Sequence, residues 1–159
     1  MTLREFYLKR ATAEFPVFLK VLRALPKDLS YKPHDRSPSA EQLAWTITNE
    51  LNACNEVVRT GKAEWKEMPP PGLDEMLQMY EKWSNELLDQ VSKMDDAVAQ
   101  RSAQFLYQGT VVFERPTVEF LWDFMFDAIH HRGQLSAYLR PMGGKVPSIY
   151  GPSADDPGM

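Results

Sequence analysis

Apolar residues recur at three- and four-residue intervals in four separate stretches of the chain. Side chains at these intervals share one face of a helix, so the pattern predicts helices at about residues 2–24, 40–60, 73–94 and 118–139. The connections between them are rich in proline, glycine and polar residues, which is typical of surface loops. We therefore expect an all-α fold, a four-helix bundle whose long connections leave room for a crossover.

The first two predicted helices carry capping signals at their ends. Thr2 with Glu5, and Ser39 with Gln42, match the pattern in which two side chains at a helix start each bond the other residue's backbone N–H. Gly61 follows the second helix, in the position where a left-handed backbone often ends a helix. These residues define the helix boundaries independently of the apolar periodicity.

The segment before the last predicted helix departs from helical spacing. In FLYQGTVVF, β-branched and aromatic residues flank Gln108 and Gly109, which favours a short hairpin or an extended crossover. After the second helix, TGKAEWKEMPPPG contains three consecutive prolines that stop the helix. The tail from about residue 141 is rich in proline and glycine, so we expect it to be irregular. One domain covering residues 1–159 is the simplest organisation for this length.

Composition and charge exclude several classes of protein. Hydrophobic residues make up 43% of the chain and charged residues 25%, as in globular proteins. With 18 basic and 22 acidic residues the net charge is −4, and no basic run indicates a nucleic-acid partner. No apolar run approaches the roughly 20 residues that span a membrane, and the N-terminus lacks a signal-peptide pattern. The single cysteine, Cys54, fits a reducing compartment, so we expect a cytoplasmic protein without membrane or nucleic-acid partners.

Three ionisable residues interrupt apolar faces of the predicted helices. Glu50 stands in the middle of an apolar stripe in the second helix, and Asp127 and His131 lie one turn apart in the last. Burying such groups is costly unless they are paired or bind a metal. A bundle interior can bring the two helices within ligand distance. Two interpretations stay open: a salt-bridged or hydrogen-bonded core cluster, or a divalent metal held by Glu50, Asp127 and His131.

An imidazole with two carboxylates is a mixed nitrogen and oxygen ligand set. Such a set suits Zn, Ni, Mn or Fe(II) and holds Cu(I) poorly. Three protein ligands would leave positions for water or substrate, as catalytic metal sites do. No glycine-rich phosphate loop, Gly-x-Ser-x-Gly elbow or Cys-x-x-Cys motif points to another chemistry.

Several residues close to these three are expected to have simpler roles. His130 lies about 100° around the helix from its histidine neighbour, and we expect it at the surface. Cys54 is expected to fill space in the core. Arg132 and Arg140 are expected to pair with acids or to bind an anionic substrate. Gly133 lowers helix stability by about 1 kcal/mol relative to alanine, and we expect a close helix–helix approach to compensate for it.

Two longer stretches resemble parts of a known family. HHRGQLSAYLRPMGGKVPSIYGPS resembles the C-terminal signature of the DinB-like (YfiT-like) superfamily of metal-dependent hydrolases, and SYKPHDRSPSAEQLAWTITNEL is similar to its loop and second helix. With the four-helix pattern, the resemblance covers nearly the whole chain. It implies a crossover bundle, a homodimer, and a metal held by one histidine on the second helix and a His-x-x-x-His pair on the last. His131 matches the second member of that pair, whereas Asp127 and Thr46 stand where the other two histidines belong.

The resemblance also implies an activity. Some members of the superfamily are similar to thiol-dependent S-transferases, so it implies a metal-dependent S-transferase or hydrolase that acts on a small molecule, with a low-molecular-weight thiol as partner. A metal would lower the pKa of the attacking thiol or water, and Glu50 or Asp127 would serve as base if the metal site were incomplete. The two replaced histidines leave an alternative open: a non-catalytic binding or stress-associated protein that retains the scaffold with a degenerate metal site.

Overall fold

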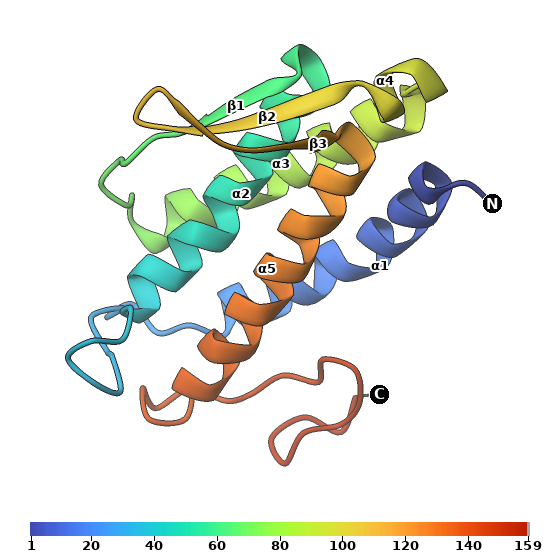
Figure 1. Ribbon diagram of the computed structural model, residues 1–159. Helices are drawn as coiled ribbons and strands as arrows, with labels where there is room; N and C mark the ends of the chain where they lie inside the picture. Colours follow the sequence, from blue (N-terminus) through green and yellow to red (C-terminus); the bar gives the residue numbers. More distant parts are fainter. Residues whose placement is uncertain (159) are drawn as a thin grey trace.

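Four long helices form a bundle, and a small sheet packs against one side of it (Figure 1). The computed structural model describes residues 1–158. The helices are α1 (Leu3–Arg23), α2 (Ala40–Thr60), α3 (Leu73–Lys93), the short α4 (Asp96–Gln100) and α5 (Thr117–Tyr138), and the strands are β1 (Lys62–Trp65), β2 (Ser102–Tyr107) and β3 (Thr110–Pro116). Each long helix begins and ends within one residue of its predicted boundary.

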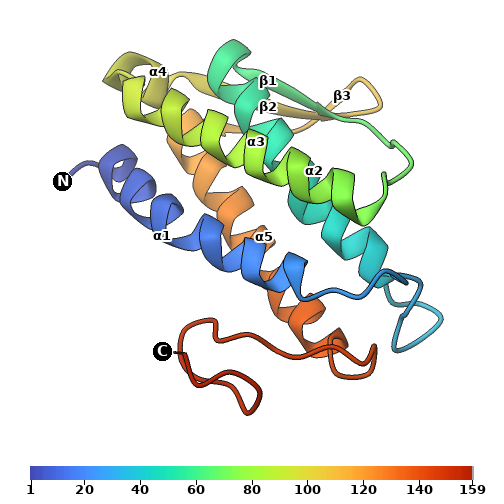
Figure 2. The ribbon, with the colours of Figure 1, turned by 180° about the vertical axis from the view of Figure 1, so that it is seen from behind.

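The order of the helices around the bundle decides which faces meet. The neighbouring pairs are α1 and α3, α3 and α2, α2 and α5, and α5 and α1. The consecutive helices α1 and α2 are therefore diagonal to one another, as are α3 and α5, so that connections cross the end of the bundle as predicted. Figure 2 shows α1 and the C-terminal tail on the side of the bundle away from the sheet. This order places α2 directly beside α5, the two helices that carry the candidate site.

The predicted capping residues define the starts of the first two long helices. The Thr2 side chain accepts a hydrogen bond from the backbone N–H of Glu5, whose side chain accepts one from Thr2 in return. Ser39 and Gln42 repeat this arrangement at the start of α2. Gly61 ends α2 with a left-handed φ of 79°, a conformation that glycine adopts without steric cost.

The three-stranded sheet corrects the all-α expectation. The predicted hairpin alternative is confirmed: β2 and β3 are antiparallel, and Gln108 and Gly109 form the turn with φ of 49° and 75°. The third strand, Lys62–Trp65, follows directly after α2 and pairs in parallel with β2. Four residues carry too little periodicity to reveal a strand, and this one exists because its partner arrives about 40 positions later.

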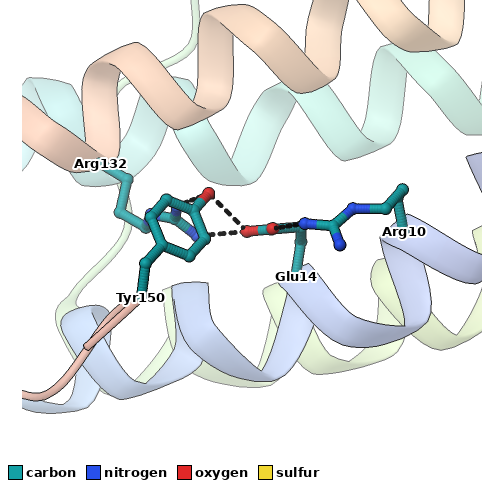
Figure 3. A network of polar contacts seen from close by, with 4 residues as sticks. All are labelled: Arg10, Glu14, Arg132 and Tyr150. Carbon is teal, nitrogen blue, oxygen red and sulfur yellow. Dashed lines mark hydrogen bonds and ion pairs between the residues drawn. The ribbon is translucent and has the colours of Figure 1, made fainter.

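A buried ionic network connects α1, α5 and the C-terminal tail (Figure 3). Glu14 is 3% exposed and accepts hydrogen bonds from Arg132 at 2.8 Å, from Arg10 at 2.8 Å and from the Tyr150 hydroxyl at 3.0 Å. The guanidinium of Arg132 lies over the rings of Phe18 and Tyr150, with centroid distances of 4.4 and 4.9 Å. Of the two predicted roles for Arg132, the structure therefore shows pairing with an acid.

Removing Arg132 should destabilise the fold strongly. Arg132→Met is expected to lower the free energy of unfolding by about 3–5 kcal/mol, because the Glu14 carboxylate stays buried without its main partner. Urea unfolding measures this loss. Arg140→Met removes an exposed pair with Asp155 and is expected to cost less than about 1 kcal/mol. Equal losses in the two variants would contradict the structural role of the network.

Two further features complete the fold. Beyond α5 the tail over residues 141–158 forms neither helix nor strand, as predicted. The predicted close approach at Gly133 is wrong, because this residue is exposed and a Cβ atom placed there would meet nothing within 4 Å. Among residues 1–158, no helix combines the length and the apolar character needed to cross a membrane.

Candidate metal centre

The three ionisable residues predicted from the apolar stripes lie close together. Glu50 projects from α2, and Asp127 and His131 project from α5, so that one ligand atom from each lies within 4.8 Å of the other two. Nε2 of His131 is 3.3 Å from Oδ2 of Asp127, one turn earlier on the same helix. Periodicity placed Glu50 and His131 within apolar stripes and Asp127 at the edge of one, and the contact between α2 and α5 brings them together.

The burial of these side chains changes steeply across the cluster. Glu50 is 4% exposed, whereas the side chains of His131 and Asp127 are 22% and 58% exposed. Glu50 and Asp127, together with Thr46, also line a pocket of about 610 Å³. The cluster therefore extends from the bundle interior to a pocket that a small molecule can enter.

Glu50 is the least satisfied member of the cluster. Its Oε2 atom is buried and has no hydrogen-bond partner among the described residues, and none of their Lys or Arg side chains pairs with it. Burial raises the pKa of Glu50 well above its usual value, and the neighbouring Asp127 carboxyl raises it further. A buried carboxyl with one unpartnered oxygen, beside a second carboxyl, indicates that a proton or a cation belongs between them.

His131 is held in a defined orientation by Gln134. Nδ1 of His131 lies 3.0 Å from Oε1 of Gln134. Because an amide oxygen only accepts hydrogen bonds, Nδ1 carries the proton in a neutral imidazole, and the lone pair of Nε2 is directed to the side where Asp127 lies. Two atoms that both carry lone pairs then face one another, an arrangement that a shared cation satisfies. The residues present therefore fit a divalent metal.

We expect Gln134 to tune metal affinity without being a ligand. Gln134→Ala should weaken metal binding by about 10- to 100-fold, because the imidazole loses the hydrogen bond that orients it. Isothermal titration of the metal-free protein measures the change. Gln134→Glu keeps an acceptor in the same place and is expected to retain the affinity. Identical affinities in wild type and Gln134→Ala would contradict this positioning role.

The neighbouring residues take the simpler roles predicted for them. Cys54 is 3% exposed, and burial, followed by the Glu50 carboxyl, raises the pKa of its thiol well above the usual range. A protonated buried thiol is a core residue and a poor ligand. His130 is exposed and is not one of the three ligand residues of the cluster.

Sequence reasoning missed the walls of the pocket. Most of them come from the sheet, through Trp65 on β1, Phe105 on β2 and Phe113 on β3. A signal was present in FLYQGTVVF, whose aromatic residues alternate as they do in a strand with one buried face. The sequence alone did not show that this face lies over the candidate metal centre.

The fold and the cluster together define a helical-bundle protein with a carboxylate–histidine site suited to a divalent metal. The family model described as the DinB family matches residues 6–158. The chain belongs to the DinB family, which confirms the resemblance seen in the sequence.

Two solved structures share the fold. A DinB-like protein from Bacillus cereus ATCC 10987 is 23% identical, with a TM-score of 0.75, and the match covers 92% of this chain and 97% of that one. The DinB-like protein YjoA from Bacillus subtilis is 21% identical, with a TM-score of 0.68, and covers 87% of this chain and 93% of its own. No curated protein matches the sequence significantly. At these identities the likeness extends to the fold alone.

Proposed function

We propose that this protein is a metal-dependent enzyme that acts on a small molecule, either as an S-transferase using a low-molecular-weight thiol or as a hydrolase. The metal ligands in this proposal are Glu50, Asp127 and His131. The observation that carries it is the buried, unpartnered Oε2 atom of Glu50, in a cluster whose ligand atoms lie within 4.8 Å of one another. Family membership supports the same reading.

Glu50 and Asp127 would have different roles in such a site. A divalent ion bound there would lower the pKa of a thiol or water that enters an open position. Glu50 supplies negative charge from the bundle interior, where the low dielectric strengthens its attraction for a cation. Asp127 is the exposed carboxylate and also lines the pocket, so it is placed to accept the proton of an entering nucleophile.

The ligand set proposed for this chain differs from the three histidines that the resemblance implies, and the difference on α2 concerns Thr46. The resemblance places the third histidine at Thr46, whose hydroxyl is a weak ligand for these metals. Glu50 lies one turn further along α2, and both residues line the same pocket. A carboxylate one turn away therefore compensates for the missing imidazole on the same face of the helix.

Reconstituted protein tests the proposal. After loading with Zn, Ni, Mn or Fe(II), the full chain is assayed for conjugation of thiols to a panel of electrophiles and for hydrolysis of small esters and amides. We expect turnover that a chelator abolishes and that the matching metal restores. Stoichiometric metal missing after reconstitution, or turnover that survives chelation, would overturn the proposal.

The alternative is a non-catalytic binding or stress-associated protein with a degenerate metal site. The specific observation in its favour is the Asp127 side chain, which is 58% exposed at a position where the resemblance places a histidine. This alternative requires that neither metal-dependent turnover nor stoichiometric metal be found. Turnover with any thiol and electrophile pair would count against it.

We also propose that α1 and α5 form the face of a homodimer. Phe6, Trp122 and Phe126 make a row of rings with centroid distances of 5.3 and 5.5 Å. Phe6 is 40% and Phe126 61% exposed, and an exposed row of aromatic side chains is typical of a partner surface.

One substitution tests the dimer face. Phe126→Glu should convert a dimer to a monomer in sedimentation velocity, because it places a charge in the apolar contact. Val111→Glu changes an exposed apolar residue of β3 that is not part of this row of rings, and it should leave the dimer intact. A wild-type protein that sediments as a monomer at micromolar concentration would contradict the proposed dimer.

A further inference from the structure

The pocket beside the candidate metal centre has aromatic walls. Its volume of about 610 Å³ falls within the range of about 300–1,000 Å³ that is typical of small-molecule sites. It lies between the sheet and the pair of helices α2 and α5, whose arrangement Figure 1 shows. Five of its lining residues are aromatic: Trp65, Phe105, Tyr107, Phe113 and Phe124.

The rings of these walls support one another and are anchored in the core. The ring of Phe105 stacks on Phe113 at 5.2 Å and meets Phe124 edge-on at 5.3 Å. Phe124 in turn stacks at 4.4 Å on Phe120, which is fully buried. Rings held in this way keep their positions when a ligand enters, so the pocket is largely formed before binding.

A bulge in β3 adds another apolar side chain to the pocket. Phe105 pairs with Phe113, but the next residue of β2, Leu106, pairs with Val111, which leaves Val112 unpaired. Successive residues of a regular strand point to opposite faces, yet Val112 and Phe113 both line the pocket. The bulge turns Val112 toward the pocket, while the exposed Val111 lies outside its lining.

Charge along the pocket is confined to two groups. Glu50 and Asp127 belong to the candidate metal centre. The other group is an ion pair, Arg115 with Asp123 at 2.9 Å, in which each charge neutralises the other. Beyond the candidate metal centre the lining therefore offers no free charge to a ligand, and its remaining surface suits an uncharged molecule.

We propose that this pocket binds a flat, uncharged aromatic molecule whose polar substituent lies against Glu50 and Asp127. Aromatic walls attract a ring system through stacked and edge-on contacts, beyond the burial of apolar surface. Binding of this class of ligand follows from the pocket alone, whereas its role as the substrate rests on the proposed function. In the S-transferase case the pocket would take the apolar electrophile, and the polar thiol would approach from the exposed side of the cluster.

Binding of the neutral fluorescent probe N-phenylnaphthylamine to the full-length, metal-free protein tests the proposal. Val112→Glu places a charge on the pocket wall and is expected to weaken binding at least about tenfold. Val111→Glu makes the same change one residue away, outside the lining, and is expected to keep the affinity within about twofold. Both positions are exposed, so both variants should fold. Equal affinities in the two variants would overturn the proposal.

Competition tests the aromatic preference separately from apolar character. Naphthalene is expected to displace the probe at about two- to tenfold lower concentration than decalin, its saturated analogue of similar size. Equal displacement by the two compounds would refute the preference for flat aromatic ligands.

Energy transfer from tryptophan locates the bound probe. Trp65 lines the pocket, and the chain has 4 tryptophans in all. Trp65→Phe keeps an aromatic wall, so this variant should bind the probe and show less energy transfer than wild type. Transfer that is unchanged in Trp65→Phe would place the probe elsewhere and overturn the proposed site.

His131→Ala separates this proposal from the proposed function. His131 is outside the pocket lining, so the variant should bind the probe as wild type does. If reconstituted wild type takes up no metal but still binds the probe, the metalloenzyme is refuted and the aromatic pocket is supported. Metal binding without probe binding would refute the aromatic pocket and leave the metalloenzyme standing.

Discussion

Replacing His131 with alanine is expected to lower the affinity for a divalent metal by at least about 100-fold, since even the loss of a group that orients a ligand costs 10- to 100-fold. His131 supplies the only imidazole of the cluster with Glu50 and Asp127, so two carboxylates would remain. Wild type should hold one ion per chain after dialysis against metal, and His131→Ala should hold almost none. Elemental analysis combined with competition by a chelator of known affinity measures both.

The chain contains a closely matched control for this experiment. His130 is the adjacent residue, is exposed, and lies outside the cluster of three ligand atoms. His130→Ala should therefore hold as much metal as wild type. If wild type and His131→Ala hold equal amounts of metal, or if His130→Ala loses it, the ligand set is wrong.

Local signals account for the parts of the fold that were predicted correctly. A capping box such as that of Ser39 and Gln42 lies within one turn, and an apolar stripe lies within one helix, so both can be read without knowing the tertiary structure. Glu50 was found in the same way, as a carboxylate inside the stripe of α2. Its closeness to Asp127 needed one further assumption, that α2 and α5 are neighbours in the bundle.

The features that were missed depend on residues far apart in the sequence. Strand β1 has four residues. It pairs with β2, which follows only after the chain has passed through α3 and α4. The aromatic pocket walls depend on that pairing and on the bulge at Val112. The predicted close approach at Gly133 was wrong for a related reason, because helix propensity does not reveal which side of α5 meets a neighbouring helix. For Arg132 the sequence left two roles open, and the buried Glu14 on another helix decided between them.

Replacing Glu50 with glutamine is expected to stabilise the metal-free protein, increasingly so as the pH rises. Burial holds the pKa of Glu50 well above its ordinary value of 4.5. Below pH 4.5 the carboxyl is protonated in both the folded and the unfolded protein, so its ionisation has no effect. Above that pH the unfolded chain loses the proton while the folded protein retains it, and the wild type loses stability until the pH passes the folded-state pKa. An amide does not titrate, so Glu50→Gln escapes this loss.

Thermal unfolding at pH 5 and pH 8 measures the effect. Glu50→Gln should exceed wild type in Tm by at least about 2–4 °C at pH 8, the shift that corresponds to 1 kcal/mol in a chain of this size, and by less at pH 5. Glu56→Gln, on the same helix, should change little at either pH. Saturating metal should make wild type the more stable protein. Free metal at about 100 times its Kd stabilises a protein that binds it by about 2.7 kcal/mol, and Glu50→Gln has lost one of the ligands. If Glu50→Gln is less stable than metal-free wild type at pH 8, the Glu50 side chain stabilises the fold and is a structural residue. A residue that serves metal binding is instead expected to lower the stability of the metal-free protein.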